Sequence, residues 1–149
     1  MSTTFPPATS ADVPDLLSMM RELYEYDHSP FDEQEHRRAL VDLLANANFG
    51  RLWLIQFNGE TVGYVILAFG YSLEFRGRDA FVDELFVCEP FRGRGIGSEA
   101  LRFVEMAARE LGIKALHLEV TRANARAQEV YRKFGYQDHD RYLMTKWLG

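Results

Sequence analysis

Cysteine is almost absent from this sequence, since Cys88 is the only one among 149 residues. A single cysteine excludes any disulfide within the chain, and it also excludes the zinc-ribbon and zinc-finger patterns that need several cysteines. We therefore expect folding in a reducing compartment and predict a cytoplasmic location. The histidines also lack metal-ligand spacing, so no metal site is expected; they are His28, His36, His117 and His139.

Long apolar runs and excess positive charge are missing as well. No stretch approaches the ~20 apolar residues of a membrane-spanning helix, and the first residues lack the basic and apolar segments of a secretory signal. Lys and Arg number 17 against 22 Asp and Glu, which gives a formal net charge of −5. We expect neither a membrane nor a nucleic-acid partner from this composition.

The composition that is present is typical of a folded domain. Hydrophobic residues make up 47% of the chain and charged residues 26%. A chain of this length buries roughly 70% of its unfolded surface without a metal or disulfide. With no internal repeat and no long linker, we predict one domain over residues 1–149.

Hydrophobic periodicity and turn signals predict an α/β fold. The patterns predict a strand at residues 3–8, helices from about residues 12 and 32, strands at 51–57, 61–69 and 80–87, a helix ending before 112, a strand at 114–120, a helix at about 124–134 and a last strand at 141–147. The clearest boundaries are the capping-box pattern of Thr9 with Asp12, the hairpin pair Asn58 and Gly59, and the helix-ending Gly112. The order predicts a mixed sheet, antiparallel early, with a right-handed parallel crossover between residues 80 and 120.

A glycine-rich turn lies between a predicted strand and a predicted helix, at residues 92–97. Gly93, Gly95 and Gly97 allow a ligand to approach the backbone closely. The helix start adds unpaired N–H groups, and Arg92 with Arg94 adds positive charge. The pattern predicts a pyrophosphate cradle.

Two other interpretations of this turn are open. One is a nucleotide-binding P-loop, which is disfavoured because the turn lacks the Lys-Ser/Thr pair that holds phosphates and magnesium. The other is a plain strand-to-helix connection with incidental arginines.

Three segments resemble motifs of the GNAT N-acetyltransferase superfamily and occur in the same order as in that family. The resemblance is to polyamine-type acetyltransferases in particular. Residues 83–87 with 92–97 look like its acetyl-CoA motif. Its second half is matched by residues 118–120, Asn124, Ala127, residues 131–136 and residues 143–146, and its opening by residues 8–12. The resemblance covers almost the whole chain. One departure is Pro7, which stands where the family often has Arg, and it puts contacts of the first strand in doubt.

The resemblance implies a mixed, mostly antiparallel central sheet flanked by helices, with the pantetheine arm of acetyl-CoA between splayed fourth and fifth strands. Backbone groups at a bulge of Phe86 and Val87 would pair with the arm, and turn amides from Arg94 to Ser98 would hold the pyrophosphate. The implied acetyl-CoA contacts are Phe86, Val87, Arg92, Gly93, Arg94, Gly95, Ile96, Gly97, Ser98, Asn124 and Tyr131.

The implied reaction is direct attack of an amine on the thioester, which requires a proton acceptor and a proton donor. Candidate acceptors are Asp79, Asp83 and Glu84; neighbours on a strand face opposite ways, so Asp83 and Glu84 share a face only if a bulge intervenes. We favour Asp83 and place Glu84 second, although either residue alone fits a solvated or salt-bridged position equally well. Tyr131 matches the family's general acid for the leaving thiolate; the alternative is a tyrosine packed on the sheet.

The acceptor is predicted from charge. Residues 22–35 contain six acidic residues and no Lys or Arg. We expect a small cationic primary amine bound by Tyr24, Tyr26, Asp27 and Asp83, with the tyrosines offering aromatic faces to an ammonium. The alternative is a solvated acidic helix surface.

The remaining aromatic and thiol groups are interpreted structurally. Cys88 has no readable histidine partner and is interpreted as a buried structural residue. Trp53 and Trp147 are interpreted as core or interface aromatics, and His117 as packed or lining.

Together with this resemblance, the sequence predicts an acetyl-CoA-dependent N-acetyltransferase. The alternative is a catalytically inert acyl-CoA-binding or sensing module on the same fold. A homodimer is possible, because similar proteins commonly form one.

Overall fold

The computed structural model describes residues 2–149, in two compact units. The first unit ends at Leu118, and the second comprises Glu119–Gly149. The single domain expected from the sequence stays a prediction.

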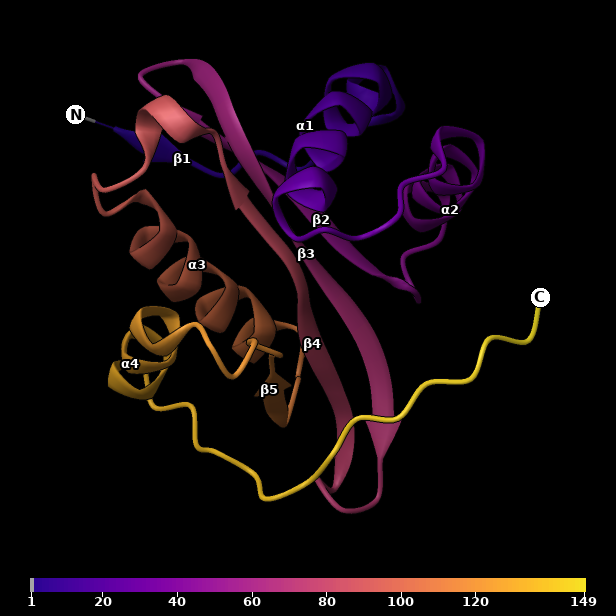
Figure 1. Cartoon of the computed structure of the whole chain (residues 1–149), viewed down its shortest axis with the longest axis vertical. Coiled ribbons are helices and arrows are strands. Elements are labelled where there is room, and N and C mark those ends of the chain that lie inside the picture. The colour runs from indigo at the N-terminus through magenta and orange to yellow at the C-terminus, as the bar shows by residue number, and fades with distance from the viewer. Residues whose placement is uncertain (1) are drawn as a thin grey trace. The chain divides into compact units, whose positions relative to one another are not determined.

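The first unit is built on a five-stranded sheet in the order β1-β2-β3-β4-β5 (Figure 1). The strands are β1 (Thr3–Thr4), β2 (Gly50–Phe57), β3 (Glu60–Ser72), β4 (Gly77–Val87) and β5 (Ala115–His117). Neighbours are antiparallel except for β4 and β5, which are parallel. The mixed, mostly antiparallel sheet expected from the sequence is confirmed.

Local sequence signals explain where most elements begin and end. Asn58 and Gly59 both have positive φ, 52° and 82°, as the tight turn between β2 and β3 requires. The Asp32 side chain accepts a hydrogen bond from the Glu35 amide at 3.0 Å and starts α2 (Glu33–Ala45). Gly112, at φ 76°, follows α3 (Ile96–Glu110).

Helices cover both faces of this sheet (Figure 1). One face packs on α1 (Val13–Tyr26) and α2, with Leu16 and Tyr64 fully buried. The other face packs on α3 through Val65, Leu67 and Val104. Each buried aliphatic side chain contributes roughly 1.5–3 kcal/mol to the burial free energy.

β4 and β5 part soon after they meet. Their ladder holds three register pairs, Asp79 with Ala115, Ala80 with Leu116 and Phe81 with His117. Beyond Phe81, β4 continues to Val87 with no further ladder on that edge among the described residues. The splayed fourth and fifth strands are confirmed, and β5 is shorter than the expected 114–120 because no ladder extends past His117.

The bulge in β4 lies elsewhere than the resemblance implied. Ile66 is opposite Glu84 and Leu67 opposite Val82, so Asp83 is the additional residue. Phe86 and Val87 instead pair regularly with Tyr64 and Gly63. The physical reason is Gly63, because any side chain there would strike the Phe86 carbonyl oxygen, and its absence lets the strands pair closely.

In the second unit, α4 (Ala125–Lys133) begins at the N-cap Asn124, and Gly135 follows it at φ 93°. The last strand expected at residues 141–147 is wrong, since these residues form no strand. Their alternating pattern has no ladder partner here, and a strand is stable only when paired. Trp147 is 86% exposed and not in a core, whereas Trp53 is buried as expected.

Between residues 2 and 149 there is no helix with both the length and the apolar character needed to cross a membrane.

Candidate active site

The glycine-rich turn forms an open backbone surface at the start of α3. Gly93 and Gly95 have left-handed φ values of 77° and 81°, and Gly95 is the N-cap of the helix. Apart from the adjoining residues of the chain, no described protein atom lies within 4 Å of where a Cβ would stand on Gly93, Gly95 or Gly97. The Ile96 side chain is buried at 2% exposure, so only its backbone is available to a ligand. The turn therefore combines free space with helix N-terminal amides, as an anion site requires.

The two arginines of the turn lie differently from each other. The Arg92 Nε donates to the Val87 carbonyl at 2.7 Å, and its guanidinium carbon lies 5.4 Å from the Tyr26 ring centroid. Arg94 lies over the Phe91 ring at 5.2 Å. Arg92 thus reaches α1, and the Tyr26 ring, expected to receive an ammonium from the substrate, already contacts a cation of the chain.

The bulge at Asp83 brings two adjacent carboxylates to the α1 side of the sheet. Glu84 accepts a hydrogen bond from the Tyr24 hydroxyl on Oε2 at 2.5 Å and from the Tyr64 hydroxyl on Oε1 at 2.7 Å. The charge of Asp83 acts on Tyr24, Tyr64 and Glu84 alike. Strand alternation allows both carboxylates to share a face only with a bulge, and a bulge is present.

Burial controls the electrostatics of these groups. Desolvation raises the pKa of Glu84, the two phenol hydrogen bonds oppose the rise, Asp83 adds to it and His36 opposes it. Desolvation also raises the pKa of Asp83, which remains open to solvent. Burial, followed by interaction with Glu84, raises the pKa of both Tyr24 and Tyr64. Both phenols therefore remain hydrogen-bond donors at neutral pH.

The Tyr24 ring is fixed within an aromatic cluster formed by α1, α2 and the segment between them. Its centroid lies 4.9 Å from the His36 ring and 5.5 Å from Phe31, each edge to face. Phe31 and His36 are stacked at 4.7 Å. Tyr24 holds Glu84 in place, a role that differs from the open aromatic face expected from the sequence.

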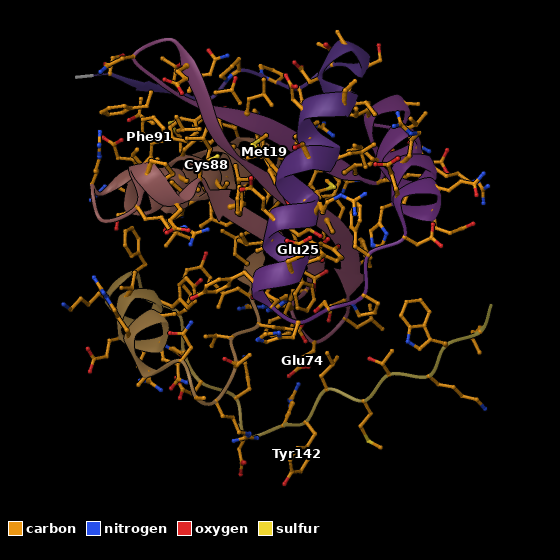
Figure 2. The ribbon with its side chains drawn as sticks, turned by 45° about the horizontal axis from the view of Figure 1, so that its top comes forward. Met19, Glu25, Glu74, Cys88, Phe91 and Tyr142 are labelled. Atoms are coloured by element: carbon orange, nitrogen blue, oxygen red, sulfur yellow. The ribbon has the colours of Figure 1, made fainter. Side chains whose placement is uncertain are left out.

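Part of the acidic run is neutralised by neighbouring arginines. Glu33 pairs with Arg21 at 3.2 Å and Glu35 with Arg38 at 3.0 Å. The acidic residues at the C-terminal end of α1 have no such pair among the described residues; they are Glu22 and Glu25, with Asp27 directly after the helix (Glu25 is labelled in Figure 2). The unpaired negative charge lies at that end of α1.

Asp79, the third candidate proton acceptor, is buried and already paired. Its Oδ2 lies 2.9 Å from His117 Nε2, and its side chain occupies the space left by the absent side chain of Gly70. The His117 ring packs against Phe75 and Phe81 at 4.5 and 5.2 Å. The packed interpretation of His117 is confirmed, and the pair fixes β4 to β5 where the two strands meet.

Cys88 follows β4 as a half-buried thiol packed on the same cluster as Met19 (Figure 2). Burial raises its pKa, so the neutral thiol predominates and a nucleophilic role is disfavoured. Across residues 2–149, no three His, Cys, Asp or Glu side chains are grouped as a metal site would need.

The second unit carries Asn124 and Tyr131. The Asn124 side chain accepts a hydrogen bond from the Ala127 amide at 3.1 Å, so it caps α4. Tyr131 is half-buried, with its ring 6.1 Å from that of Tyr136, and burial raises its pKa. A protonated Tyr131 suits a proton donor, and the roles of both residues in acetyl-CoA binding stay predictions.

Residues 15–136 match the family model described as "Acetyltransferase (GNAT) family". This chain belongs to that family. The GNAT domain is 30% identical over 140 residues to the thialysine N-epsilon-acetyltransferase of Bos taurus, covering 88% of this chain and 82% of the relative. It is 29% identical over 136 residues to the aminoalkylphosphonate N-acetyltransferase of Salmonella typhimurium, covering 91% and 86%.

A solved structure also resembles this GNAT domain closely. It is the integron cassette protein HFX_CASS3 from the mobile metagenome of Cole Harbour Salt Marsh, with a TM-score of 0.85 and 34% identity over 97% of this chain and 90% of that one. GNAT enzymes use acetyl-CoA as the acetyl donor, and the open turn with Arg92 and Arg94 suits its pyrophosphate.

The sequence did not predict three contacts of this site, which join Tyr24 to Glu84, Tyr64 to Glu84 and Arg92 to Tyr26. Tyr64 is one apolar-strand residue among many, and nothing in the sequence ties it to a residue twenty positions away. The aromatic Tyr26 and the turn arginine were each noted separately, but their contact depends on how α1 packs on the sheet.

Proposed function

We propose that this GNAT enzyme transfers the acetyl group of acetyl-CoA to a small cationic primary amine by direct attack. The observation that carries the proposal is the pair of carboxylates at the β4 bulge, one open to solvent and one held by two phenols. Such a pair can attract an ammonium ion and accept its proton.

Asp83 is the proposed proton acceptor. A lysine-like amine has a pKa of ~10.4 and arrives protonated. Asp83 is exposed, and its raised pKa makes it a stronger base than an ordinary surface aspartate. When Asp83 takes the first proton, the neutral amine nitrogen can form a bond to the acetyl carbon while the bond from that carbon to sulfur breaks. The nitrogen then loses its second proton through solvent, and this balances the proton that the leaving sulfur receives. Glu84 is second, because both of its oxygens already accept hydrogen bonds.

Tyr131 is the proposed proton donor to the leaving sulfur. A thiolate with a pKa of ~8.5 leaves more readily when a donor supplies a proton. The raised pKa of Tyr131 keeps its phenol protonated at neutral pH.

The proposed donor site is the glycine-rich turn with the adjacent end of β4. Phe86 is 2% exposed, so it offers backbone groups alone. The Val87 carbonyl accepts a hydrogen bond from Arg92 in this structure, and its second lone pair could accept one from the pantetheine arm. Acetyl-CoA supplies the acetyl group and a thiolate leaving group, and the turn amides with Arg92 and Arg94 would hold its pyrophosphate.

The amine class is supported by the unpaired acidic end of α1. A positively charged tail on the amine would be attracted to Glu22, Glu25 and Asp27. The name of the thialysine relative states that it acetylates an amine, which supports a small amine acceptor here. The aminoalkylphosphonate relative shows by its name that an acceptor in this family can also carry a phosphonate.

The test is release of CoA thiol with a matched panel of amines. The panel contains a diamine, a monoamine of the same length, an aminoalkylphosphonate and a peptide with a free N-terminus. We expect the highest kcat/KM for the diamine, with a preference that shrinks as salt rises, because exposed charges are screened beyond ~8–10 Å.

Equal rates for the diamine and the monoamine at both salt concentrations would contradict the cationic acceptor. Binding of acetyl-CoA without thiol release for any amine would instead favour the inert acyl-CoA-binding module. A cytoplasmic location and a homodimeric state remain predictions from the sequence alone.

A further inference from the structure

Both carboxylate oxygens of Glu84 are engaged by neutral donors from two different elements. Tyr24 belongs to α1 and Tyr64 to β3, and their hydroxyls lie 2.5 and 2.7 Å from the two oxygens. Tyr64 has no exposed surface, and Tyr24 is wedged against the rings of Phe31 and His36. Neither phenol can turn away without disturbing the core, so Glu84 is fixed in one position.

We propose that Tyr24 and Tyr64 are positioning residues for proton transfer, which hold Glu84 charged and immobile beside Asp83 so that Asp83 alone remains free to accept a proton. The inference rests on the proposed function of the same site. It assigns the adjacent carboxylates separate tasks. Both oxygens of Glu84 accept hydrogen bonds from phenols, whereas Asp83 faces solvent.

The choice of phenols has a consequence for the charge of the site. A lysine or arginine would also hold Glu84, but its positive charge would cancel one carboxylate and repel an ammonium substrate. Phenol hydroxyls satisfy the buried carboxylate and add no charge. The phenols therefore leave the negative charge of the pair uncancelled for a cationic amine.

The charged and titratable groups that act on this pair come from four elements. Asp83 and Glu84 lie on β4, Tyr64 on β3, Tyr24 on α1 with Asp27 directly after it, and His36 on α2. Asp83 raises the pKa of Glu84, and His36 lowers it. Asp27 acts on Tyr24 and, like Asp83, favours the protonated phenol.

The pH dependence follows from the sign of the hydrogen bond. Each phenol bond favours the ionised form of Glu84, so removing one hydroxyl raises the pKa of Glu84. A protonated Glu84 no longer adds its negative charge to the field at Asp83, so Asp83 becomes a weaker acceptor for the amine proton. Activity is then lost at a higher pH on the acidic side of the profile.

The experiment compares pH profiles of kcat/KM for the wild type, Tyr24→Phe and Tyr64→Phe, with Tyr71→Phe as the matched control. Tyr71 lies on β3, is 78% exposed and is far along the strand from Glu84. We expect the acidic limb of Tyr24→Phe and Tyr64→Phe to move to higher pH, while the amine KM on the alkaline plateau stays unchanged. Tyr71→Phe should follow the wild type. Should the buried Tyr64→Phe fail to fold, Tyr24→Phe carries the test.

A double substitution isolates the route through Glu84. In a Glu84→Gln background there is no charge to hold, so adding Tyr24→Phe should leave the acidic limb where Glu84→Gln places it. An acidic limb of Tyr24→Phe that coincides with the wild type would overturn the proposal. A rise in amine KM alone would also overturn it, because it would show that Tyr24 contacts the substrate directly. Wild-type protein that releases no thiol with any amine would count against the proposed function instead.

Discussion

Asp83 and Glu84 are neighbours of the same chemical class, yet their surroundings differ. Glu84 lies between two phenols, while Asp83 projects from the bulge with solvent access. Gly93 and Gly95 contribute through the absence of a side chain, which permits the left-handed backbone of the turn. Single positions therefore determine both halves of the candidate site.

At Gly95, a substitution to valine should impair acetyl-CoA binding. The residue has φ 81°, and a Cβ there meets no protein atom, so the change adds backbone strain of about 1–2 kcal/mol without a steric clash inside the fold. Gly112→Val is the matched control, since Gly112 has φ 76° and open space as well. We expect similar losses of thermal stability in both variants and a raised KM for acetyl-CoA in Gly95→Val alone. Equal acetyl-CoA KM values in the two variants would remove the turn from the donor site.

Tyr131→Phe should lower kcat by ~10²-fold or more if its phenol protonates the leaving sulfur. The ring and its contact with Tyr136 are retained, so the acetyl-CoA KM should change little. Steady-state rates with a thioester of a more acidic thiol provide the check, because a better leaving group should reduce the defect. A Phe variant with full kcat would show that the sulfur leaves without this donor.

At the scale of single elements, strands and helices differ in how far the sequence predicts them. Helix starts such as Asp32 and the β2–β3 turn at Asn58 and Gly59 were predictable, because the residues that cap or turn the chain are local. The bulge at Asp83 and the absent strand at 141–147 were not, because register and pairing depend on distant residues. Gly63, opposite Val87, shows such a dependence.

In the candidate site, too, local motifs were predictable and contacts between distant residues were not. The glycine-rich turn and the β4 carboxylates were predictable as motifs. Tyr24 was singled out, but its partner Glu84 lies sixty positions away, so its role in holding a carboxylate could not be read from spacing. Tyr64 gave no signal at all, because a tyrosine in an apolar strand is ordinary core.

For α4, the capping residue Asn124 provides a test that separates structure from binding. Asn124→Ala removes the cap bond to Ala127 and should cost about 1 kcal/mol. Asn124→Ser can restore that bond. We expect serine to recover thermal stability but not the acetyl-CoA KM, because only the amide side chain reaches the arm as the family resemblance implies. Full recovery of both by serine would make Asn124 a helix cap and nothing more.

For the molecule as a whole, the candidate proton acceptor opposes folding stability. The pKa of Asp83 is raised by folding, so its charged form is disfavoured in the native state once the pH exceeds the unfolded pKa. The resulting loss of stability grows as pH rises from the unfolded pKa to the folded pKa and is constant above it. It vanishes at low pH, where both states are protonated.

Asp83→Asn should therefore melt at a higher temperature than the wild type at neutral pH while losing acetyl transfer. Thermal unfolding at neutral and acidic pH measures this, and the two curves should converge on acidification. The exposed Asp42→Asn, on α2, is the control and should melt with the wild type at both pH values. A neutral-pH melting point of Asp83→Asn at or below that of the wild type would argue against a desolvated charge at this position.

The additional residue in β4 also reverses which face of the sheet the later side chains of the strand occupy. Side chains of a strand alternate, so Val82 and Phe86, four positions apart, should share a face. Instead Val82 packs with the α3 cluster and Phe86 with the α1 cluster. Deleting Asp83 would restore strict alternation and force one part of β4 to turn over, exposing either Val82 or Phe86 and displacing their neighbours. A one-residue deletion at this position therefore has a larger effect than a substitution. It would change which side chains of β4 pack in the α1 cluster and which pack in the α3 cluster.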